Sequence, residues 1–408
     1  MEEEGVGGED RIRSLPESLI RHILSLLPTK CVVATTILSR GWNNLWISLP
    51  VLDFREWKSP NTQETLSSTN SFMDFVDRVL LLRNMSDIKK FCLTCNSEYF
   101  DDQRIKAWIL TAIQCRVEEL IVSRDASERV DIIPVDLYTC ESLTSLDIDL
   151  FGGQHLNLPQ LISFPRLKIL QLSEISVFRQ RNIQQLFSNC PILEELCLKY
   201  CLLNHLNIIS STLKSLTFVS SLRICMSDVK IKIDTPNLIS ITVDDGIPQH
   251  LVVESFPSLV DADIHRMYTD PSVPVDVIPN FVKKLSNVKH LKLSGNISET
   301  QQVKSLFSFL QFSPILESLV FGRVCYGDEA NEDAFTLDVV PHCLLMNLKS
   351  IKFQYFEGQL KELDLVQLFL QNARVLQMVI IEISSDHFVS SDKKKHSAKD
   401  VEDFNKIV

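Results

Sequence analysis

The residues of this sequence whose types and spacing could support chemistry are cysteines and histidines. Cys92 and Cys95 have the C-x-x-C spacing of a redox-active dithiol or of half a zinc site. A second cluster consists of Cys190, Cys197 and Cys201. No second pair accompanies the first, the nine histidines are dispersed, and neither a G-x-S-x-G motif nor a glycine-rich phosphate loop is present. The sequence therefore predicts no catalytic residue, no metal and no cofactor, and it indicates that the cysteines fill the interior.

Composition favours a soluble protein of a reducing compartment. Of the 408 residues, 45% are hydrophobic and 23% charged. The longest apolar runs are far shorter than the ~18–20 residues of a membrane span. The 11 cysteines favour buried thiols over a disulfide framework, and the acidic N-terminus is unlike a secretory leader. A net charge of −11 argues against general nucleic-acid binding. We therefore expect a cytoplasmic or nuclear protein, or one present in both compartments, with no membrane or nucleic-acid partner.

The first segment that could position a binding surface is the run of residues 10–54, which predicts short amphipathic helices. Ser14 can cap a helix, with Glu17 three residues later. Pro28 is expected to end this helix and Thr29 to cap the next. Apolar residues recur at helical spacing at Leu19, Ile20, Ile23, Leu24 and Leu27, and again at Leu38, Trp42, Leu45 and Trp46. So short a segment cannot bury all these side chains by itself, and this predicts a protein partner.

Beyond Phe54 the dominant pattern is a repeated L-x-x-L-x-L element in which other apolar residues can replace Leu. Successive copies start roughly 20 to 30 residues apart, the spacing of leucine-rich repeats. Each copy predicts one short strand with its alternate apolar side chains inward, and the copies must stack because none can bury that face alone. The copies are Ile88/Phe91/Leu93, Val117/Leu120/Val122, Leu143/Leu146/Ile148, Leu167/Leu170/Leu172, Leu193/Leu196/Leu198, Leu213/Leu216/Phe218, Leu238/Ile241/Val243, Leu259/Ala262/Ile264, Val288/Leu291/Leu293, Leu316/Leu319/Phe321, Leu348/Ile351/Phe353 and Val375/Met378/Ile380.

The spacers between copies predict the outer face of an irregular α/β solenoid. Helical apolar patterns begin at Phe72, Ile105 and Val303. Prolines such as Pro165 stand just before many copies, where they end the preceding segment and lead into a strand. The uneven spacing predicts an irregular horseshoe. After Ser384 the chain turns polar and charged, which predicts a mobile tail.

Residues 10–56 resemble an F-box, the module that docks a substrate receptor onto the Skp-type adaptor of cullin-RING ubiquitin ligases. The matching residues are Leu15-Pro16, the stretch from Ile23 to Lys30, Leu38-Ser39, Trp42 and Leu45-Trp46. The family usually has a basic or polar residue in place of Gly41, and often an acidic one in place of Cys31. The resemblance implies an adaptor-binding surface made of Leu15, Pro16, Leu19, Ile20, Ile23, Leu24, Leu27, Pro28, Leu38, Trp42 and Trp46.

The resemblance extends through most of the chain to a plant family that combines an F-box, leucine-rich repeats and a C-terminal FBD domain. The stretch from Phe72 to Val122, the unit SFPRLKILQL and the succession from Leu348 to Leu376 are typical of it. It implies a small helical F-box, then an irregular leucine-rich-repeat solenoid that ends in an FBD-like αβ cap. The expected segments are a disordered N-terminus at 1–9, the F-box at 10–56, leucine-rich repeats at 70–340, FBD-like repeats at 341–384 and a polar tail at 385–408.

The resemblance implies a non-catalytic substrate-recognition subunit of an SCF-type ubiquitin ligase. The F-box would hold the Skp-type adaptor, and through it the cullin and RING subunits, while the repeats would hold an unidentified target protein. A second class of function stays open, a repeat scaffold without ligase coupling in which residues 10–54 only cap the solenoid. The intact Leu15-Pro16 favours the receptor, and Gly41 favours the scaffold.

Target recognition is expected on the concave strand face, because curved solenoids usually bind there. Strand alternation places the residues between the inward apolar ones on that face. Asp244, Asp261 and Asp263 predict an acidic centre and a target contact rich in Lys or Arg. The predicted target-binding residues are Glu195, Lys199, Thr242, Asp244, Asp261, Asp263, His265, His290, Lys292, Lys352 and Gln354.

Overall fold

The computed structural model describes residues 15–35, 45–55, 65–83, 86–125, 131–177, 180–203, 205–219, 230–244, 250–265, 277–296, 309–325 and 339–383. The predicted N-terminus at 1–9 and the polar tail at 385–408 lie outside these residues. The chain divides into a first unit, Met1–Leu193 with Tyr200–Leu203, and a second unit, Glu194–Lys199 with Asn204–Val408. In the described part of the chain, no helix has both the length and the apolar character to cross a membrane.

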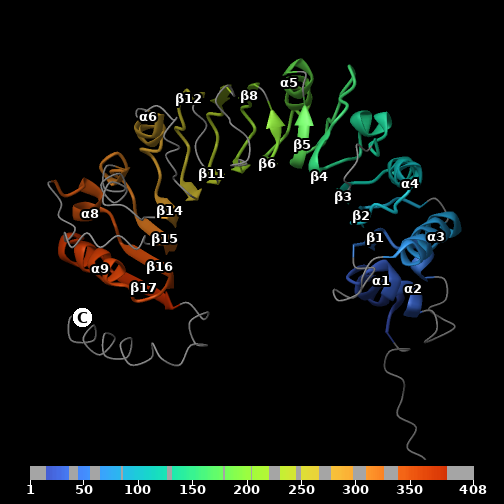
Figure 1. Cartoon of the computed structure of the whole chain (residues 1–408), viewed down its shortest axis with the longest axis horizontal. Coiled ribbons are helices and arrows are strands. Elements are labelled where there is room, and N and C mark those ends of the chain that lie inside the picture. The colour runs from blue at the N-terminus through green and yellow to red at the C-terminus, as the bar shows by residue number, and fades with distance from the viewer. Residues whose placement is uncertain are drawn as a thin grey trace, which may run out of the picture. The chain divides into compact units, whose positions relative to one another are not determined.

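The first unit joins the N-terminal helices to the first strands of a parallel sheet (Figure 1). Its helices are α1 (Glu17–Ser25), α2 (Thr29–Ala34), α3 (Leu66–Leu82), α4 (Asp102–Gln114) and α5 (Gln180–Ser188), with the 3₁₀ helices η3 (Leu45–Ser48) and η4 (Val135–Thr139). Its strands are β1 (Val51–Phe54), β2 (Lys90–Cys95), β3 (Glu119–Arg124), β4 (Ser145–His155), β5 (Ile169–Val177) and β7 (Leu202–Leu203). Strands β1 to β5 pair in parallel in sequence order, and β7 pairs with β5.

The second unit is a parallel sheet of repeats with helices between its last strands. Its main sheet consists of β6 (Glu195–Lys199), β9 (Ser215–Val219), β11 (Ser240–Asp244), β13 (Asp261–His265), β14 (His290–Asn296), β15 (Ser318–Cys325), β16 (Ser350–Phe356) and β17 (Met378–Ile383), in that order. A separate parallel sheet has the order β12 (His250–Val253), β10 (Lys230–Asp234), β8 (His205–Ile209). The helices are α6 (Val277–Lys283), α8 (His342–Met346) and α9 (Leu360–Asn372).

Every predicted copy of the repeat forms a strand, and the predicted alternation fixes which side chains are buried. In β3, for example, Leu120 is 0% and Val122 1% exposed, while Ile121 between them is half-buried. The predicted helices around Phe72 and Ile105 are α3 and α4, and the helix predicted from Val303 starts outside the described residues. The C-terminal repeats form the predicted pair of strands, β16 and β17, bridged by α9. The expected α/β solenoid of repeats is thereby confirmed.

Polar side chains directly before the strands tie neighbouring repeats together. Asn237 Nδ2 donates a hydrogen bond to the carbonyl oxygen of Ser211 at 2.7 Å, and Asn347 Nδ2 donates to that of Pro314 at 2.8 Å. Ser142 Oγ donates in the same way to the carbonyl oxygen of Val117, also at 2.7 Å. These bonds satisfy backbone acceptors in the turns of the preceding repeat, as buried or half-buried carbonyl groups require.

The last repeat has a different register from the predicted one. The predicted copy Val375/Met378/Ile380 would point Met378 inward. The sheet instead aligns Val379 and Ile381 with the buried residues of β16, and Met378 is 50% exposed. The sequence from Met378 to Ile381 is apolar throughout, so no alternation in it could set the face of the strand.

The helix ends and some strands also differ from the expectations. Helix α1 begins at Glu17, with Pro16 at the N-cap position, and Ser14, the predicted cap, lies outside the described residues. It ends at Ser25, before Pro28, and Thr29 is the first residue of α2 rather than its cap. The sheet of β8, β10 and β12 was not expected, although its short strands alternate apolar and polar residues.

Strand β1 fastens the N-terminal helices to the repeat sheet. It pairs with β2 in parallel, with Leu52 aligned to Phe91. Thr29 Oγ1 in α2 accepts a hydrogen bond from the Asp53 N–H of β1 at 2.7 Å. The buried Arg83, just after α3, donates from Nη1 to the carbonyl oxygen of Leu49 at 2.7 Å. The helices at the N-terminus are thus part of the first unit and not a separate tethered body.

Candidate protein-docking surfaces

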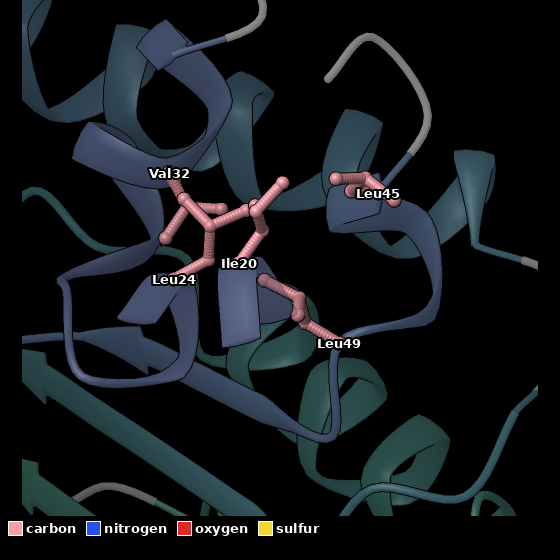
Figure 2. Packing of buried hydrophobic residues seen from close by; sticks show 5 residues of the cluster. All are labelled: Ile20, Leu24, Val32, Leu45 and Leu49. Carbon is pink, nitrogen blue, oxygen red and sulfur yellow. The ribbon is translucent and has the colours of Figure 1, made fainter. Parts of the chain in front are cut away.

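Helix α1 has a buried side that forms the small core of the N-terminal segment. Its residues Ile20 and Leu24 are 6% and 1% exposed. Figure 2 shows their side chains directed toward Val32 of α2, with Leu45 and Leu49 at the η3 end of the cluster. The half-buried Leu15 and Trp46 pack against this cluster from outside. The core holds α1, α2 and η3 together as one unit.

The other side of α1 presents large apolar side chains to solvent. Leu19 is 43% exposed, Ile23 40%, Leu27 38% and Leu26 72%. Four such side chains within nine residues make an apolar surface, which we call the α1 surface and define by these four residues. Exposed apolar residues that are grouped, rather than scattered singly, mark sites of protein interaction.

The structure divides the predicted adaptor-binding residues into three groups. Leu19, Ile23 and Leu27 lie on the α1 surface, and Leu15, Pro16, Pro28 and Trp46 are exposed or half-buried around it. Ile20 and Leu24 lie in the core, where almost none of their surface is open to a partner. Leu38 and Trp42, like Gly41, fall outside the described residues.

Leu26 is the residue of the α1 surface that the sequence analysis missed. It directly follows the last residue of α1, seven residues after Leu19 and three after Ile23, so the helical spacing of those residues could have selected it. A further signal was the Leu26-Leu27 pair directly before Pro28. Because the proline prevents a further helical turn, two large apolar residues directly before it have no following turn to pack against and can remain exposed.

Polar contacts fix the orientation of α1. Arg21 donates from Nε and Nη2 to Glu17 Oε1 at 2.9 and 2.7 Å, one turn earlier on the helix. Its Nη1 donates to Ser48 Oγ of η3. The Arg21 side chain therefore bridges α1 and η3.

The predicted target-binding residues all lie on strands of the main sheet of the second unit. They come from β6, β11, β13, β14 and β16, and each is exposed or half-buried and adjoins at least one buried apolar residue. Strand pairing sets Thr242 beside Asp263 and Asp263 beside Lys292, so the residues form rows across the sheet. We call this surface the strand face. Its placement on one side of the sheet follows the predicted alternation.

Ion pairs make the centre of the strand face less acidic than predicted. Asp263 Oδ2 lies 3.0 Å from Lys292 Nζ, and its Oδ1 lies 2.8 Å from His265 Nε2. Asp263 is therefore engaged by its neighbours and is not available as an unpaired acid for a target. Asp261 has no ion pair among the described residues, and strand register places it beside Ser240 and His290.

Most cysteines of the described residues are buried. Cys92 and Cys95 are 0% and 1% exposed, and their odd spacing along β2 points their side chains to opposite faces, so they form neither a dithiol pair nor a half-site. Cys190 Sγ donates a hydrogen bond to the carbonyl oxygen of Leu186 at 3.1 Å. Among the described residues, no group of three or more His, Cys, Asp and Glu is placed to hold a metal ion.

Alkylation of the native protein is expected to distinguish Cys31 from the buried thiols. Burial raises the pKa of Cys92 and Cys343 to about 11 and that of Cys190 to about 12, so these thiols stay protonated at neutral pH. Cys31 is exposed on α2. Peptide mass mapping after a short iodoacetamide pulse should show Cys31 modified first, and the other three only after denaturation. Native labelling of Cys92 or Cys190 at the rate of Cys31, or a ubiquitin thioester on either, would contradict this assignment.

Comparison with known proteins matches three segments of the chain to family models. Residues 12–54 match the F-box domain, residues 105–321 match the model described as "FBD-associated F-box protein At5g56370, LRR repeats", and residues 338–381 match FBD.

Three relatives from Arabidopsis thaliana are similar over most of their length. The FBD-associated F-box protein At4g10400 is 29% identical over 91% of this chain and 92% of its own. The putative F-box/FBD/LRR-repeat protein At2g05300 is 29% identical over 96% and 92%. The F-box protein At4g09920 is 31% identical over 70% and 87%.

Proposed function

Because the chain belongs to the family of FBD-associated F-box proteins with leucine-rich repeats, we propose that it is the substrate-recognition subunit of an SCF-type ubiquitin ligase. The α1 surface binds a Skp-type adaptor, which connects the chain to the cullin and RING subunits. The repeats bind the protein to be ubiquitinated, and the other subunits carry out the transfer. The free thiols of the described residues, most of them buried, support a cytoplasmic or nuclear location.

The observation that carries this proposal is the two-sided construction of α1. One side is anchored in a core with Val32, Leu45 and Leu49, and the other leaves Leu19, Ile23, Leu26 and Leu27 in water. A helix that served only to close the end of a repeat sheet would turn its large apolar side chains toward that sheet. Here the apolar surface remains after the internal core is complete, which supports a partner that covers it.

A scaffold without ligase coupling is the alternative, and the attachment of β1 to the repeat sheet favours it. Through β1, the N-terminal helices cover the first strand of the sheet, as a cap does in a repeat protein. Mixing the full-length chain with a purified Skp-type adaptor and separating the products by size decides between the two. A stable complex that recruits a cullin supports the receptor. A chain that stays separate from every adaptor of its own organism supports the scaffold.

Reversing the charge of Asp261 tests target recognition by the strand face. Asp261→Lys should reduce capture of the target at least about tenfold, because a like charge placed opposite a basic contact costs more than ~1.4 kcal/mol. Its melting temperature should stay close to that of the wild type, since Asp261 makes no ion pair among the described residues. Quantitative mass spectrometry of proteins that co-purify with each chain measures the effect.

The matched control is Asp136→Lys, the same charge change on the exposed surface of η4 in the first unit. It should retain the full set of co-purifying proteins. Asp263 is unsuitable for this test, because its replacement would also break the contacts with Lys292 and His265. An unchanged target set for Asp261→Lys would move recognition away from the β13 part of the strand face, most simply to the C-terminal FBD repeats.

A further inference from the structure

The last strand of the second unit has one edge that no described strand covers. Strand β17 pairs with β16 along one side and stands at the end of the main sheet (Figure 1). An unpaired strand edge exposes a row of backbone donors and acceptors that can pair with another strand. Native proteins usually protect such an edge with charged residues, proline or a covering element. The sequence of β17, MVIIEI, contains no proline and no lysine.

The backbone of β17 shows which residues present their polar groups at this open edge. The Met378 N–H donates to the carbonyl oxygen of Lys349 at 3.1 Å, so Met378 faces the β16 side. In a strand, backbone groups alternate between the two edges. Ile380 and Glu382 therefore face β16 as well, and Val379, Ile381 and Ile383 direct their N–H and C=O groups to the open edge.

Val379, Ile381 and Ile383 also carry apolar side chains, and the sheet leaves these side chains partly or largely exposed. Ile351 and Phe353 of β16 are 1% and 4% exposed. Val379 and Ile381 stand beside them in register, yet both are only half-buried. Ile383 is 68% exposed. In a stacked repeat the next copy would cover these positions, and a terminal repeat needs a cap for the same reason.

The other edge strand of the main sheet, β1, shows how an edge can be covered. There, the N–H of Asp53 in β1 is satisfied by Thr29 Oγ1 of α2. The described residues provide no such donor or acceptor for Val379, Ile381 or Ile383. Within the part of the chain that the structure describes, the β17 edge is therefore apolar in its side chains and open in its backbone.

The one charged residue of β17 is neutralised within its own sheet. Glu382 Oε1 lies 2.7 Å from Lys352 Nζ, and Glu382 Oε2 accepts from Gln354 Nε2 at 3.3 Å. The hydrogen bond from Lys352 holds the pKa of Glu382 below its usual value, so Glu382 remains ionised and paired at neutral pH. A second β17 strand can therefore approach without meeting an uncompensated charge.

We propose that β17 is a dimerisation edge that pairs in antiparallel fashion with β17 of a second copy of this chain. A two-fold axis through Ile381 places Ile381 opposite its counterpart and Val379 opposite the Ile383 of the other copy. All of these residues direct backbone groups to the open edge, so this register forms about six interchain backbone hydrogen bonds. It also places Val379, Ile381 and Ile383 of both copies, six apolar side chains in all, on the same face of the joined sheet.

This register keeps the acidic residues apart. Ile380 lies opposite the Glu382 of the other copy, so the two Glu382 side chains do not face each other, and like charges directly opposite would be unfavourable. The contact is isologous, as in most homodimers, so it closes after two chains and does not propagate. Its consequence for function is a bivalent receptor with two strand faces, which gains avidity for a target that presents two binding segments.

The test uses the full-length chain and measures its mass by light scattering after size exclusion. The wild type should have about twice the monomer mass of 46.6 kDa. Ile381→Lys and Ile381→Glu each place two like charges face to face at the axis. Each variant alone should therefore raise the dimer dissociation constant at least tenfold. An equimolar mixture of the two should form the dimer again, because the opposite charges then meet.

Leu161→Lys is the matched control, since Leu161 is 70% exposed in the first unit, and it should remain dimeric. Melting curves and adaptor binding of each Ile381 variant show whether the chain is folded and whether the separate function at α1 is intact. A wild type that is monomeric at tens of micromolar overturns the proposal. So does a dimer that persists in both Ile381 variants, or a mixture of folded variants that stays monomeric. If removal of residues 384–408 converts a monomeric wild type into a dimer, those residues are the occupant of the edge, and the proposal is also wrong.

Discussion

Replacing Leu19 and Ile23 together with Ala is expected to weaken binding of a Skp-type adaptor by at least ~2 kcal/mol, or roughly 30-fold in Kd. The two side chains are 43% and 40% exposed on the α1 surface, so both are available to a partner. Each methylene removed from a buried contact costs ~0.8 kcal/mol, and the two substitutions together remove several such groups. The costs of association reduce this sum, which is why the expected loss is that of an interface hot spot and not the full transfer value. Titration calorimetry with purified adaptor measures the change.

The matched control for this pair is Leu161→Ala, which shortens an exposed leucine of the first unit far from α1 in sequence. It should bind the adaptor as tightly as the wild type. The melting temperature of the Leu19/Ile23 variant should stay near that of the wild type, because neither residue belongs to the internal core. Undiminished adaptor binding by the folded double variant would show that the α1 surface is not the interface.

Leu24→Ala is expected to lower the stability of the first unit, whereas Leu26→Ala is expected to leave it almost unchanged. Both substitutions shorten a leucine near the C-terminal end of α1. Leu24 is 1% exposed and packs among Ile20, Val32 and the η3 residues. Its truncation leaves a cavity and should lower the free energy of unfolding of the first unit by ~2–5 kcal/mol. Leu26 is 72% exposed, so its truncation should change stability by less than about 0.5 kcal/mol.

Binding completes this comparison. Leu26→Ala should weaken adaptor binding while its melting curve is unchanged, which would place the residue in the interface. Leu24→Ala should weaken binding only as far as it unfolds α1, so its affinity should recover at lower temperature, where the folded fraction is larger. Denaturant unfolding followed by circular dichroism, with affinity measured at two temperatures, separates the two cases. Loss of stability in Leu26→Ala would mean that its side chain is buried in solution.

Strand positions could be predicted from the sequence because most repeats alternate apolar and polar residues along the strand. In β4, for example, Leu146 and Ile148 are buried on one face, and the polar Asp147 stands between them. The same rule failed at β17, where Met378 to Ile381 are all apolar and either register buries similar side chains. There, only the pairing with β16 decides, and pairing depends on the whole sheet.

Helical spacing located the candidate interface but could not show which of its residues face the internal core and which face a partner. Leu19, Ile20, Ile23 and Leu24 all belong to one apolar stripe, and the stripe is wide enough to serve both the core and a partner. Which side faces inward depends on where α2 and η3 lie, and that is a tertiary property. For the same reason the sequence could not show that Lys292 and His265 would engage Asp263, because those contacts arise from strand register and side-chain geometry.

The sharing of β1 between the N-terminal helices and the repeat sheet has a consequence for the lifetime of the protein. Opening of the first repeat would separate β1 from β2 and break the Arg83 contact with Leu49, so α1 and the first strands open as one cooperative unit. A ligand held by α1 therefore stabilises the strands as well, by ~2.7 kcal/mol when its concentration is 100-fold above its Kd. Under the proposed function, we expect chains without adaptor to open more often and to be the better substrates for cellular proteases. The abundance of the chain would then follow the abundance of its adaptor, and unassembled chains would be removed without a dedicated signal.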